Sequence, residues 1–429
     1  MATSDKPKRA GTPVDLLPVI RKSGVLTDKQ FDELRANVLS GDYPNDSHML
    51  ADRLVKEKLL TEYQVHRFLS NKSHGLTVGR YVILDRVGSG SMGRVYKATH
   101  RLMGRVVAIK IIAPEIVTNE RVVARFQREM RLVGRLDHPN VVRAYDADQI
   151  ERILYIVMEY VPGESLGTRL RVKGPIPPVE VVHFAAQAAL GLGHAHAQGI
   201  VHRDIKPSNL YLSDSRQVKV LDLGLGVLME ADTQASFATA DGIAVGTIDY
   251  MSPEQATGKE VDGRSDLYSL GCAMYHLMTG LLPFPGDSPI ERLGKRINER
   301  PVPLSDVLPR VPRRLAETMD KLMATKPSDR FQTGEEAAAA LQSLTRKRSA
   351  PRPAPATVQP RGDAQDDDAG VAVSVEPALP PAVGAAELPR WLQPLVALAE
   401  RSPTGALVTL IGTLAAMFGI GLMVGWALL

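Results

Sequence analysis

The chain has 429 residues, 44% of them hydrophobic, which is enough for one large or two modest domains with sizeable cores. Its 52 Lys and Arg residues nearly balance 48 Asp and Glu, and a net charge of +4 gives little support for a nucleic-acid partner, so we expect none. The single cysteine, Cys272, excludes an internal disulfide framework and fits a reducing compartment. The polar start of the chain shows no secretory signal, and we predict a disordered tail over residues 1–13.

A small helical domain is predicted over residues 14–75, where a weak internal repeat recurs at an offset of 34 residues. In each copy a threonine, Thr27 or Thr61, is followed three residues later by a glutamine, Gln30 or Gln64. This spacing is the capping-box pattern of a helix start. Two helix–turn–helix units are therefore expected, either as an interaction domain or as a packing extension of the next domain.

Residues 80–344 form one dense block whose apolar pattern changes along its length. Alternating and β-branched residues predict strands up to about residue 112, and a helix is predicted over residues 119–136. Two short strands follow, and beyond about residue 165 the apolar spacing is mostly helical. We predict an α+β fold in which a β-rich lobe and a larger helical lobe enclose a cleft.

A glycine-rich segment, GSGSMGRV from Gly88 to Val95, lies between two predicted strands. A dinucleotide-binding fold would place these glycines between a strand and a helix, so that fold is not favoured. The backbone N–H groups of such a hairpin can close over phosphates. The pattern alone is not specific, because any glycine-rich hairpin would match it. The next strand ends in Lys110, for which Glu129 on the following helix is a candidate partner. Taken one at a time, both residues are equally compatible with ordinary surface charges.

The run HRDIKPSN, from His202 to Asn209, is the most specific chemical pattern in the chain. Asp204 can accept the proton of an attacking hydroxyl, and Lys206 can neutralise a transferring phosphoryl group. Asn209 can bind a divalent ion through its amide oxygen, and Asp222 follows at the end of a predicted strand. Oxygen ligands on two adjacent loops suit Mg²⁺, which binds few carboxylates and completes its coordination with phosphate and water.

In this order the motifs resemble those of the eukaryotic-like serine/threonine protein kinases that many bacteria encode. The resemblance covers about 265 residues and implies a bilobal protein-kinase fold. It implies ATP with Mg²⁺ or Mn²⁺ as cofactors, and transfer of the γ-phosphoryl group to serine or threonine hydroxyls of protein substrates. Asp204 would be the catalytic base, assisted by Lys206, and Asn209 and Asp222 would hold the metal ions.

The resemblance also assigns roles around this centre. Lys110 would hold the α and β phosphates and pair with Glu129. The backbone from Glu159 to Val161 would meet adenine, with Met158 as gatekeeper. The residues assigned to ATP binding are Val87, Gly88, Ser89, Gly90, Ser91, Met92, Gly93, Arg94, Val95, Lys110, Glu129, Glu159 and Val161. The residues assigned structural or regulatory roles are His202, Arg203, Glu254, Asp266 and Arg330.

Two of these assignments are specific contacts, and two residues depart from the family pattern. Glu254 would pair with Arg330, and Asp266 would bind the backbone of the catalytic loop. Leu223 stands where the family has the Phe of Asp-Phe-Gly, and Ser252 stands where it has the Ala of Ala-Pro-Glu. Neither change removes a charge or a ligand, so we expect full activity.

Arg203 precedes the catalytic aspartate, so phosphorylation between residues 225 and 252 would supply its counter-charge and order that segment. The candidate phosphorylation sites are Ser236, Thr239 and Thr247. The first two are favoured because Thr247 lies close to the expected position of the substrate.

The C-terminal part differs in composition from the rest. Residues 345–390 are rich in proline and alanine and are predicted to be a linker. No charged residue occurs from Ser402 to Leu429. A run this long exceeds what a helix needs to cross a bilayer, so we predict a transmembrane helix over residues 404–428 in preference to a buried helix.

The flanking charges predict the orientation of this helix. Arg390 and Arg401 precede it and no Lys or Arg follows it, so the kinase domain is expected on the cytoplasmic side of the inner membrane. Gly421 and Gly425 form a small-residue pair through which two such helices can approach, so a homodimer is an open alternative.

Three hypotheses of function follow. The leading one is a membrane-anchored serine/threonine kinase. The second is a phosphate-binding scaffold that recruits partners through its N-terminal helices. A kinase for small molecules is disfavoured, because Gly246-Thr247 and the segment Ser252–Glu254 resemble a platform for a peptide. His183, His194 and His196 lie on one predicted helix without acidic or cysteine partners, so we interpret them as packed or surface histidines.

Overall fold

The computed structural model describes residues 15–90, 92–114, 116–117, 120–225 and 248–345. The predicted tail, the predicted transmembrane helix and all but the first residue of the predicted linker lie outside these ranges. Within the described ranges, no helix has both the length and the apolar character needed to cross a membrane.

Four short helices open the described chain. Two of them begin at the predicted capping boxes, which are confirmed. The side chains of Thr27 and Thr61 accept from the backbone N–H groups of Gln30 and Gln64, and the side chains of these glutamines accept from the backbone N–H groups of the threonines. Each box satisfies backbone donors that a helix start leaves open. These helices are α1 (Leu16–Ser23), α2 (Asp28–Ser40), α3 (Ser47–Lys56) and α4 (Glu62–Leu69).

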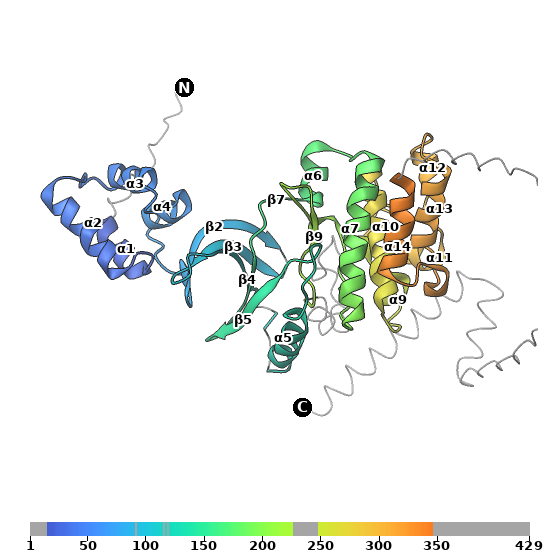
Figure 1. The fold of residues 1–429 in the computed structure, drawn as a ribbon, viewed down its shortest axis with the longest axis horizontal. Coiled ribbons are helices and arrows are strands. Elements are labelled where there is room, and N and C mark those ends of the chain that lie inside the picture. The colour runs from blue at the N-terminus through green and yellow to red at the C-terminus, as the bar shows by residue number, and fades with distance from the viewer. Residues whose placement is uncertain (1–14, 91, 115, 118–119, 226–247, 346–429) are drawn as a thin grey trace, which may run out of the picture. The chain divides into compact units, whose positions relative to one another are not determined.

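A six-stranded antiparallel sheet follows, with the strand order β1-β2-β3-β4-β6-β5 (Figure 1). The central strand β4 is buried on both faces: Val107 and Ile109 pack with the N-terminal helices, whereas Ile112 belongs to the core that contains the next helix, α5 (Glu120–Val133). The strands are β1 (Thr77–Val78), β2 (Tyr81–Gly90), β3 (Gly93–His100), β4 (Val106–Ile112), β5 (Ala144–Ile150) and β6 (Ile153–Glu159).

Helices α1–α4 and one face of this sheet share a single hydrophobic cluster. Phe68 and Leu54 from the helices are fully buried in it, as are Ile83 and Ala98 from the sheet. Figure 1 shows α4 beside β2, in agreement with the contacts between these two elements. Of the two alternatives for this region, the contacts favour a packing extension of the sheet.

The second lobe is helical around a small three-stranded sheet of order β7-β8-β9. Its longest helices, α7 and α10, are apolar on most sides because they lie at its centre and contact each other. The strands are β7 (Gly163–Ser165), β8 (Leu210–Ser213) and β9 (Val218–Val220). The helices are α6 (Leu166–Lys173), α7 (Pro178–Ala197), α9 (Pro253–Ala256), α10 (Gly263–Thr279), α11 (Pro289–Asn298), α12 (Leu304–Val307), α13 (Arg313–Leu322) and α14 (Gly334–Thr345).

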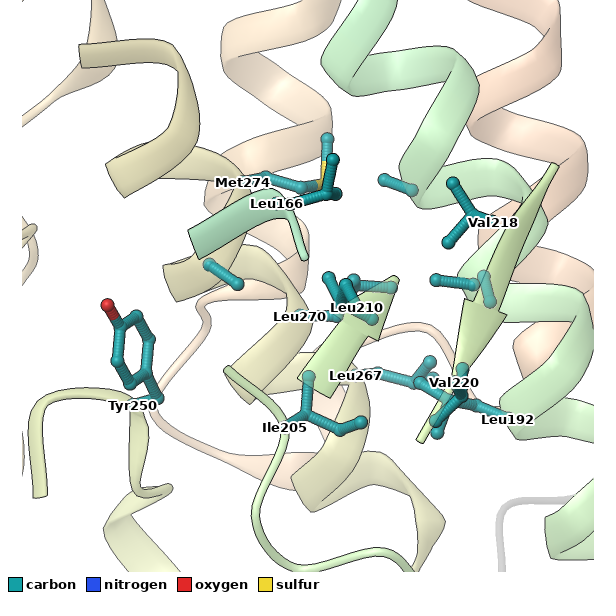
Figure 2. Close-up of a cluster of buried hydrophobic side chains, with 14 of the residues drawn as sticks. Leu166, Leu192, Ile205, Leu210, Val218, Val220, Tyr250, Leu267, Leu270 and Met274 are labelled. Atoms are coloured by element: carbon teal, nitrogen blue, oxygen red, sulfur yellow. The ribbon is translucent and has the colours of Figure 1, made fainter. Parts of the chain in front are cut away.

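A cluster of buried side chains supports the loop between α7 and β8 (Figure 2). Ile205 of this loop is 1% exposed and packs in the same core as Leu210, Val220 and Leu267. Because protein cores are close-packed, the loop backbone on either side of Ile205 is held in one position. The α+β fold with a β-rich lobe and a helical lobe is confirmed.

Candidate active site

The three polar residues predicted at the catalytic centre lie together in the loop before β8. Lys206 Nζ is 2.8 Å from Asp204 Oδ2, and Asn209 Nδ2 donates to Asp204 O at 2.8 Å and to Oδ2 at 3.2 Å. Asp204 is only 9% exposed, so its charge is stabilised by these two partners. The amide nitrogen of Asn209 is turned toward Asp204, and its Oδ1, which lies 3.4 Å from Ser208 Oγ, has a second lone pair with which it can bind a ligand.

Asp222 lies next to this loop and takes a partner that differs from the sequence-based expectation. The Leu221 N–H donates to Asn209 O at 2.9 Å, which ties the two segments together. Lys110 Nζ is 2.7 Å from Asp222 Oδ2, and no ion pair joins Lys110 to Glu129 among the residues that the structure describes. The expected Lys110–Glu129 pair is therefore absent here. The largely buried lysine needs a counter-charge, and Asp222 supplies it.

The residues after Asp222 pack closely against α5. Leu223, which departs from the family pattern, is 5% exposed and belongs to the main core, so it fills an apolar position. Gly224 has φ +77°, and a Cβ built there would lie 2.7 Å from Val133 Cγ2. Only glycine permits both this backbone conformation and this approach of α5. Asp222 itself has φ +61°, a left-handed conformation that is uncommon outside glycine and is found at functional sites.

The glycine-rich segment is the β2–β3 hairpin, as predicted. Gly88 pairs with Val95 and Gly90 pairs with Gly93, and Ser91 lies outside the described residues. Gly93 has φ +136°, and a Cβ there would come within 2.0 Å of Ile111 O on β4. The remaining members of the segment are Val87, Ser89, Met92 and Arg94.

The predicted hinge begins where β6 ends. Met158, the expected gatekeeper, pairs with Ala108 of β4, and Val161 is partly buried. Glu159 Oε2 forms an ion pair of 2.9 Å with Lys219 Nζ of β9, so the end of the large sheet is bonded to the second lobe. Lys219 is a residue that the sequence did not bring to attention, since a lysine in a short strand carries no specific signal.

Asp266 binds the backbone of the catalytic loop, which confirms the expected contact. At the start of α10 it is 1% exposed, and it accepts from the N–H groups of His202 and Arg203 at 2.8 Å each. His196 Nε2 is also 2.8 Å from Asp266 Oδ2. Burial acts to raise the pKa of Asp266, but the bond to His196 and the donors of His202 outweigh it, so the pKa lies below its ordinary value.

The same contacts give His196 a role that the sequence did not reveal. The sequence predicts only a packed or surface histidine at this position, because no spacing to acidic or cysteine residues distinguishes it. His194 stacks on His138 with ring centroids 5.1 Å apart, and His183 lies 3.0 Å from Gln187. Within the described ranges, no three His, Cys, Asp or Glu residues group closely enough to hold a metal ion.

The expected Glu254–Arg330 pair is confirmed. Arg330 NH1 and NH2 lie 2.6 and 2.8 Å from the two carboxylate oxygens, and Ser265 Oγ donates to Glu254 Oε1. Burial acts to raise the pKa of Glu254, yet the hydrogen bonds from Arg330 and Ser265 lower it overall. Ser252, the second departure from the family pattern, is the N-cap of α9 in a capping box with Gln255.

Gln255 connects this helix to the catalytic loop, because its Nε2 donates to Arg203 O at 2.9 Å. Beside the loop lies a cavity of about 670 Å³, lined among others by Lys206, Ser208 and Tyr250. The candidate phosphorylation sites Ser236, Thr239 and Thr247 lie outside the described residues.

Comparison with known proteins agrees with this arrangement. A family model described as "Protein kinase domain" matches residues 81–343. A probable serine/threonine-protein kinase of Clostridium perfringens is 38% identical over 265 residues, which cover 62% of this chain and 38% of that protein. The serine/threonine-protein kinase PknB of Mycobacterium leprae is 37% identical over 261 residues, which cover 60% of this chain and 42% of the relative.

The chain thus spans about two fifths of the length of these curated relatives. Among solved structures, the PknI kinase domain of Mycobacterium tuberculosis matches with a TM-score of 0.51 and 28% identity, covering 63% of this chain and 97% of that one. The family model covers more than half of the chain, from the first residue of β2 to the last turn of α14. The chain therefore belongs to the protein kinase family, and its two lobes form a protein kinase domain that is similar to those of bacterial serine/threonine-protein kinases.

Proposed function

We propose that this chain transfers the γ-phosphoryl group of ATP to serine and threonine hydroxyls of proteins. The observation that carries the proposal is the joining of Asp204, Lys206 and Asn209 in one hydrogen-bonded loop, itself bonded to the segment that carries Asp222. Asp204 would accept the proton of the substrate hydroxyl as the new oxygen–phosphorus bond forms and the bond from the γ-phosphorus to the departing ADP breaks. Lys206, beside it, neutralises charge on the transferring group.

The protein atoms proposed to hold the metal are Asn209 Oδ1 and the carboxylate of Asp222. The orientation of the Asn209 amide fits this role, because its nitrogen donates to Asp204 and its Oδ1 keeps a lone pair beside the bond from Ser208. Mg²⁺ or Mn²⁺ bound there would neutralise the phosphates of ATP. Lys110 is proposed to bind the α and β phosphates, and Glu129 remains a proposed partner of Lys110 when nucleotide is bound.

The hairpin from Gly88 to Val95 would cover the phosphates with its backbone N–H groups, and the backbone from Glu159 to Val161 would meet adenine. Autophosphorylation at Ser236, Thr239 or Thr247 would activate the enzyme by supplying a negative partner for Arg203.

The decisive experiment uses the purified full chain with Mg-ATP and a generic basic protein as acceptor. Asp204→Asn keeps the size of the side chain but cannot accept the proton, so we expect labelling to fall by about 10²- to 10⁴-fold. Phosphopeptide mapping of the wild type would identify the autophosphorylated residues. Equal labelling by wild type and Asp204→Asn would reject the enzyme and favour the scaffold hypothesis.

We further propose that residues 404–428 anchor the chain in the inner membrane with the kinase domain on the cytoplasmic side. The support is the absence of charged residues from Ser402 to Leu429, with Arg390 and Arg401 before the apolar run. The full chain should remain in the membrane fraction after alkaline carbonate washing, and deletion of the apolar run should release it. Replacing Gly421 and Gly425 by leucine would test whether they support a homodimer.

A further inference from the structure

The second capping box of the N-terminal helices does more than start a helix. In α4 the side chain of Gln64 is 2% exposed, and its Oε1 accepts from Thr61 N at 2.9 Å. Its other end, Nε2, donates to Ile83 O of β2 at 2.7 Å. Thr61 Oγ1 donates in turn to Leu84 O at 2.6 Å. One capping box is therefore bonded to two consecutive carbonyl groups of β2.

These carbonyls lie where the pairing of β2 with its neighbouring strands is interrupted. The edge strand β1 pairs with β2 only as far as Val82, and the Ile83 N–H donates to Leu76 O just beyond it. A register shift between Ile83 and Asp85 leaves Leu84 without a partner in β3. A bulge of this kind disrupts the ladder locally and leaves one residue unpaired. Gln64 and Thr61 supply the donors at this point.

The two carbonyls that accept these bonds lie on β2 shortly before the glycine-rich hairpin. Gly88 is four residues beyond Leu84 on the same strand, past a second register shift between Arg86 and Gly88, and the hairpin that it opens is the proposed phosphate-binding loop. A shift of one residue at the bulge would turn every following side chain to the opposite face of the sheet. It would also displace the backbone N–H groups that meet the phosphates.

The two copies of the internal repeat allow the capping box at Thr61 to be compared with the one at Thr27. In the first copy, Thr27 and Gln30 form the same capping box, but both are exposed, and their hydrogen bonds within the described residues stay in the first turn of α2. Only in the second copy is the capping glutamine, Gln64, buried against the sheet. Capping a helix therefore does not account for the burial of this glutamine.

We propose that Thr61 and Gln64 are positioning residues for nucleotide binding: they fix the register of β2 and so preorganise the Gly88–Val95 hairpin. The inference rests on the proposed kinase function. A loop that is already ordered loses less conformational entropy when it binds its ligand, so the bonds lower the cost of binding ATP.

The experiment uses the purified full chain in detergent at pH 8. Gln64→Glu retains the acceptor that caps α4, because a capping box takes either residue, but its carboxylate cannot donate to Ile83 O. Thr61→Val removes the hydroxyl that bonds Leu84 O, and Thr61→Ser retains it. The matched controls are Gln30→Glu and Thr27→Val in the first copy. The readouts are the dissociation constant of a non-hydrolysable Mg-ATP analogue and amide hydrogen exchange over residues 81–95.

We expect Gln64→Glu and Thr61→Val to weaken analogue binding roughly three- to tenfold, the range set by losing one buried hydrogen bond, and to speed exchange in β2 and the hairpin. Thr61→Ser and both control variants should stay within about twofold of wild type. Lower melting temperatures for Gln64→Glu and Thr61→Val with unchanged binding and exchange would overturn the proposal and leave a purely structural role. Because exchange needs no catalysis, a wild type that binds analogue but transfers no phosphate would reject the proposed function and leave this test intact.

Discussion

Arg330 and Glu254, 76 residues apart in the chain, form a bidentate ion pair that is almost completely buried. The guanidinium also donates to the carbonyls of Ala324, Thr325 and Arg264. The pair therefore joins the start of α9 to the segment between α13 and α14. Its geometry suits arginine specifically, because the planar fork matches both carboxylate oxygens.

We expect Arg330→Met to lower the free energy of unfolding by about 3–5 kcal/mol, because it leaves the Glu254 carboxylate buried without a counter-charge. Chemical denaturation of the purified chain measures this. The double variant with Glu254→Gln should recover part of the loss. Arg313→Met, which breaks an ion pair whose side chains are 92% and 57% exposed, is the control and should leave stability nearly unchanged. A loss as large for Arg313→Met would contradict the argument.

The lowered pKa of Asp266 predicts that the free energy of unfolding decreases at acid pH. Its pKa in the folded chain lies below the ordinary value, so ionisation stabilises the fold fully above the ordinary carboxyl pKa of about 4. The contribution is lost as the pH falls through the lower, folded-state pKa. The stability difference between wild type and Asp266→Asn should therefore shrink as the pH falls below about 4. Urea denaturation from pH 3 to 7 measures it, and a difference that grows on acidification would refute the prediction.

Gly93 should tolerate no side chain. Gly93→Ala would place a Cβ within 2.0 Å of Ile111 O at φ +136°, so β3 and β4 would have to separate locally. We expect a fall in melting temperature of several degrees together with weaker ATP binding. Gly90→Ala is the matched control, since at that position of the same hairpin no atom of another described residue, its chain neighbours aside, lies within 4 Å of where a Cβ would lie. Equal melting temperatures for the two variants would show that the close approach is absent in solution.

Cys272 should be unreactive in the folded protein. Its side chain is 0% exposed in α10, and burial raises the pKa of its thiol to about 11. The reactive thiolate is therefore scarce at pH 8, and we expect alkylation to be about a hundredfold or more slower than in denaturant. Mass spectrometry follows this without ambiguity because the chain has only one cysteine. Rapid alkylation under native conditions would place the thiol at an accessible surface.

Much of the site was predictable because its signals are local. The residues from His202 to Asn209 owe their proximity to one short loop, and strand, turn and glycine signals placed the Gly88–Val95 hairpin. The capping boxes at Thr27 and Thr61 were predictable for the same reason, since four consecutive residues contain all the atoms involved. The Glu254 and Arg330 pair followed from the resemblance to protein kinases, not from spacing.

Other contacts could not be predicted, because they depend on which surfaces meet. The partner of Lys110 is Asp222 and not Glu129, and the choice depends on how closely α5 and the end of β9 approach β4. His196 acquires its bond to Asp266 only because α7 and α10 cross at that point. Neither histidine nor lysine carries a sequence signal for such an encounter.

The amino-acid sequence by itself determined the kinase motifs, the two lobes and both capping boxes, because hydrophobic period, turn chemistry and capping act over a few residues. Tertiary structure alone decided that Gln64 is buried against β2 while its counterpart Gln30 stays exposed. The two copies have the same capping residues, and only the second copy lies beside the interrupted stretch of β2. That difference is energetic and non-local: a buried carbonyl must find a donor, and the fold determines which donor lies within reach.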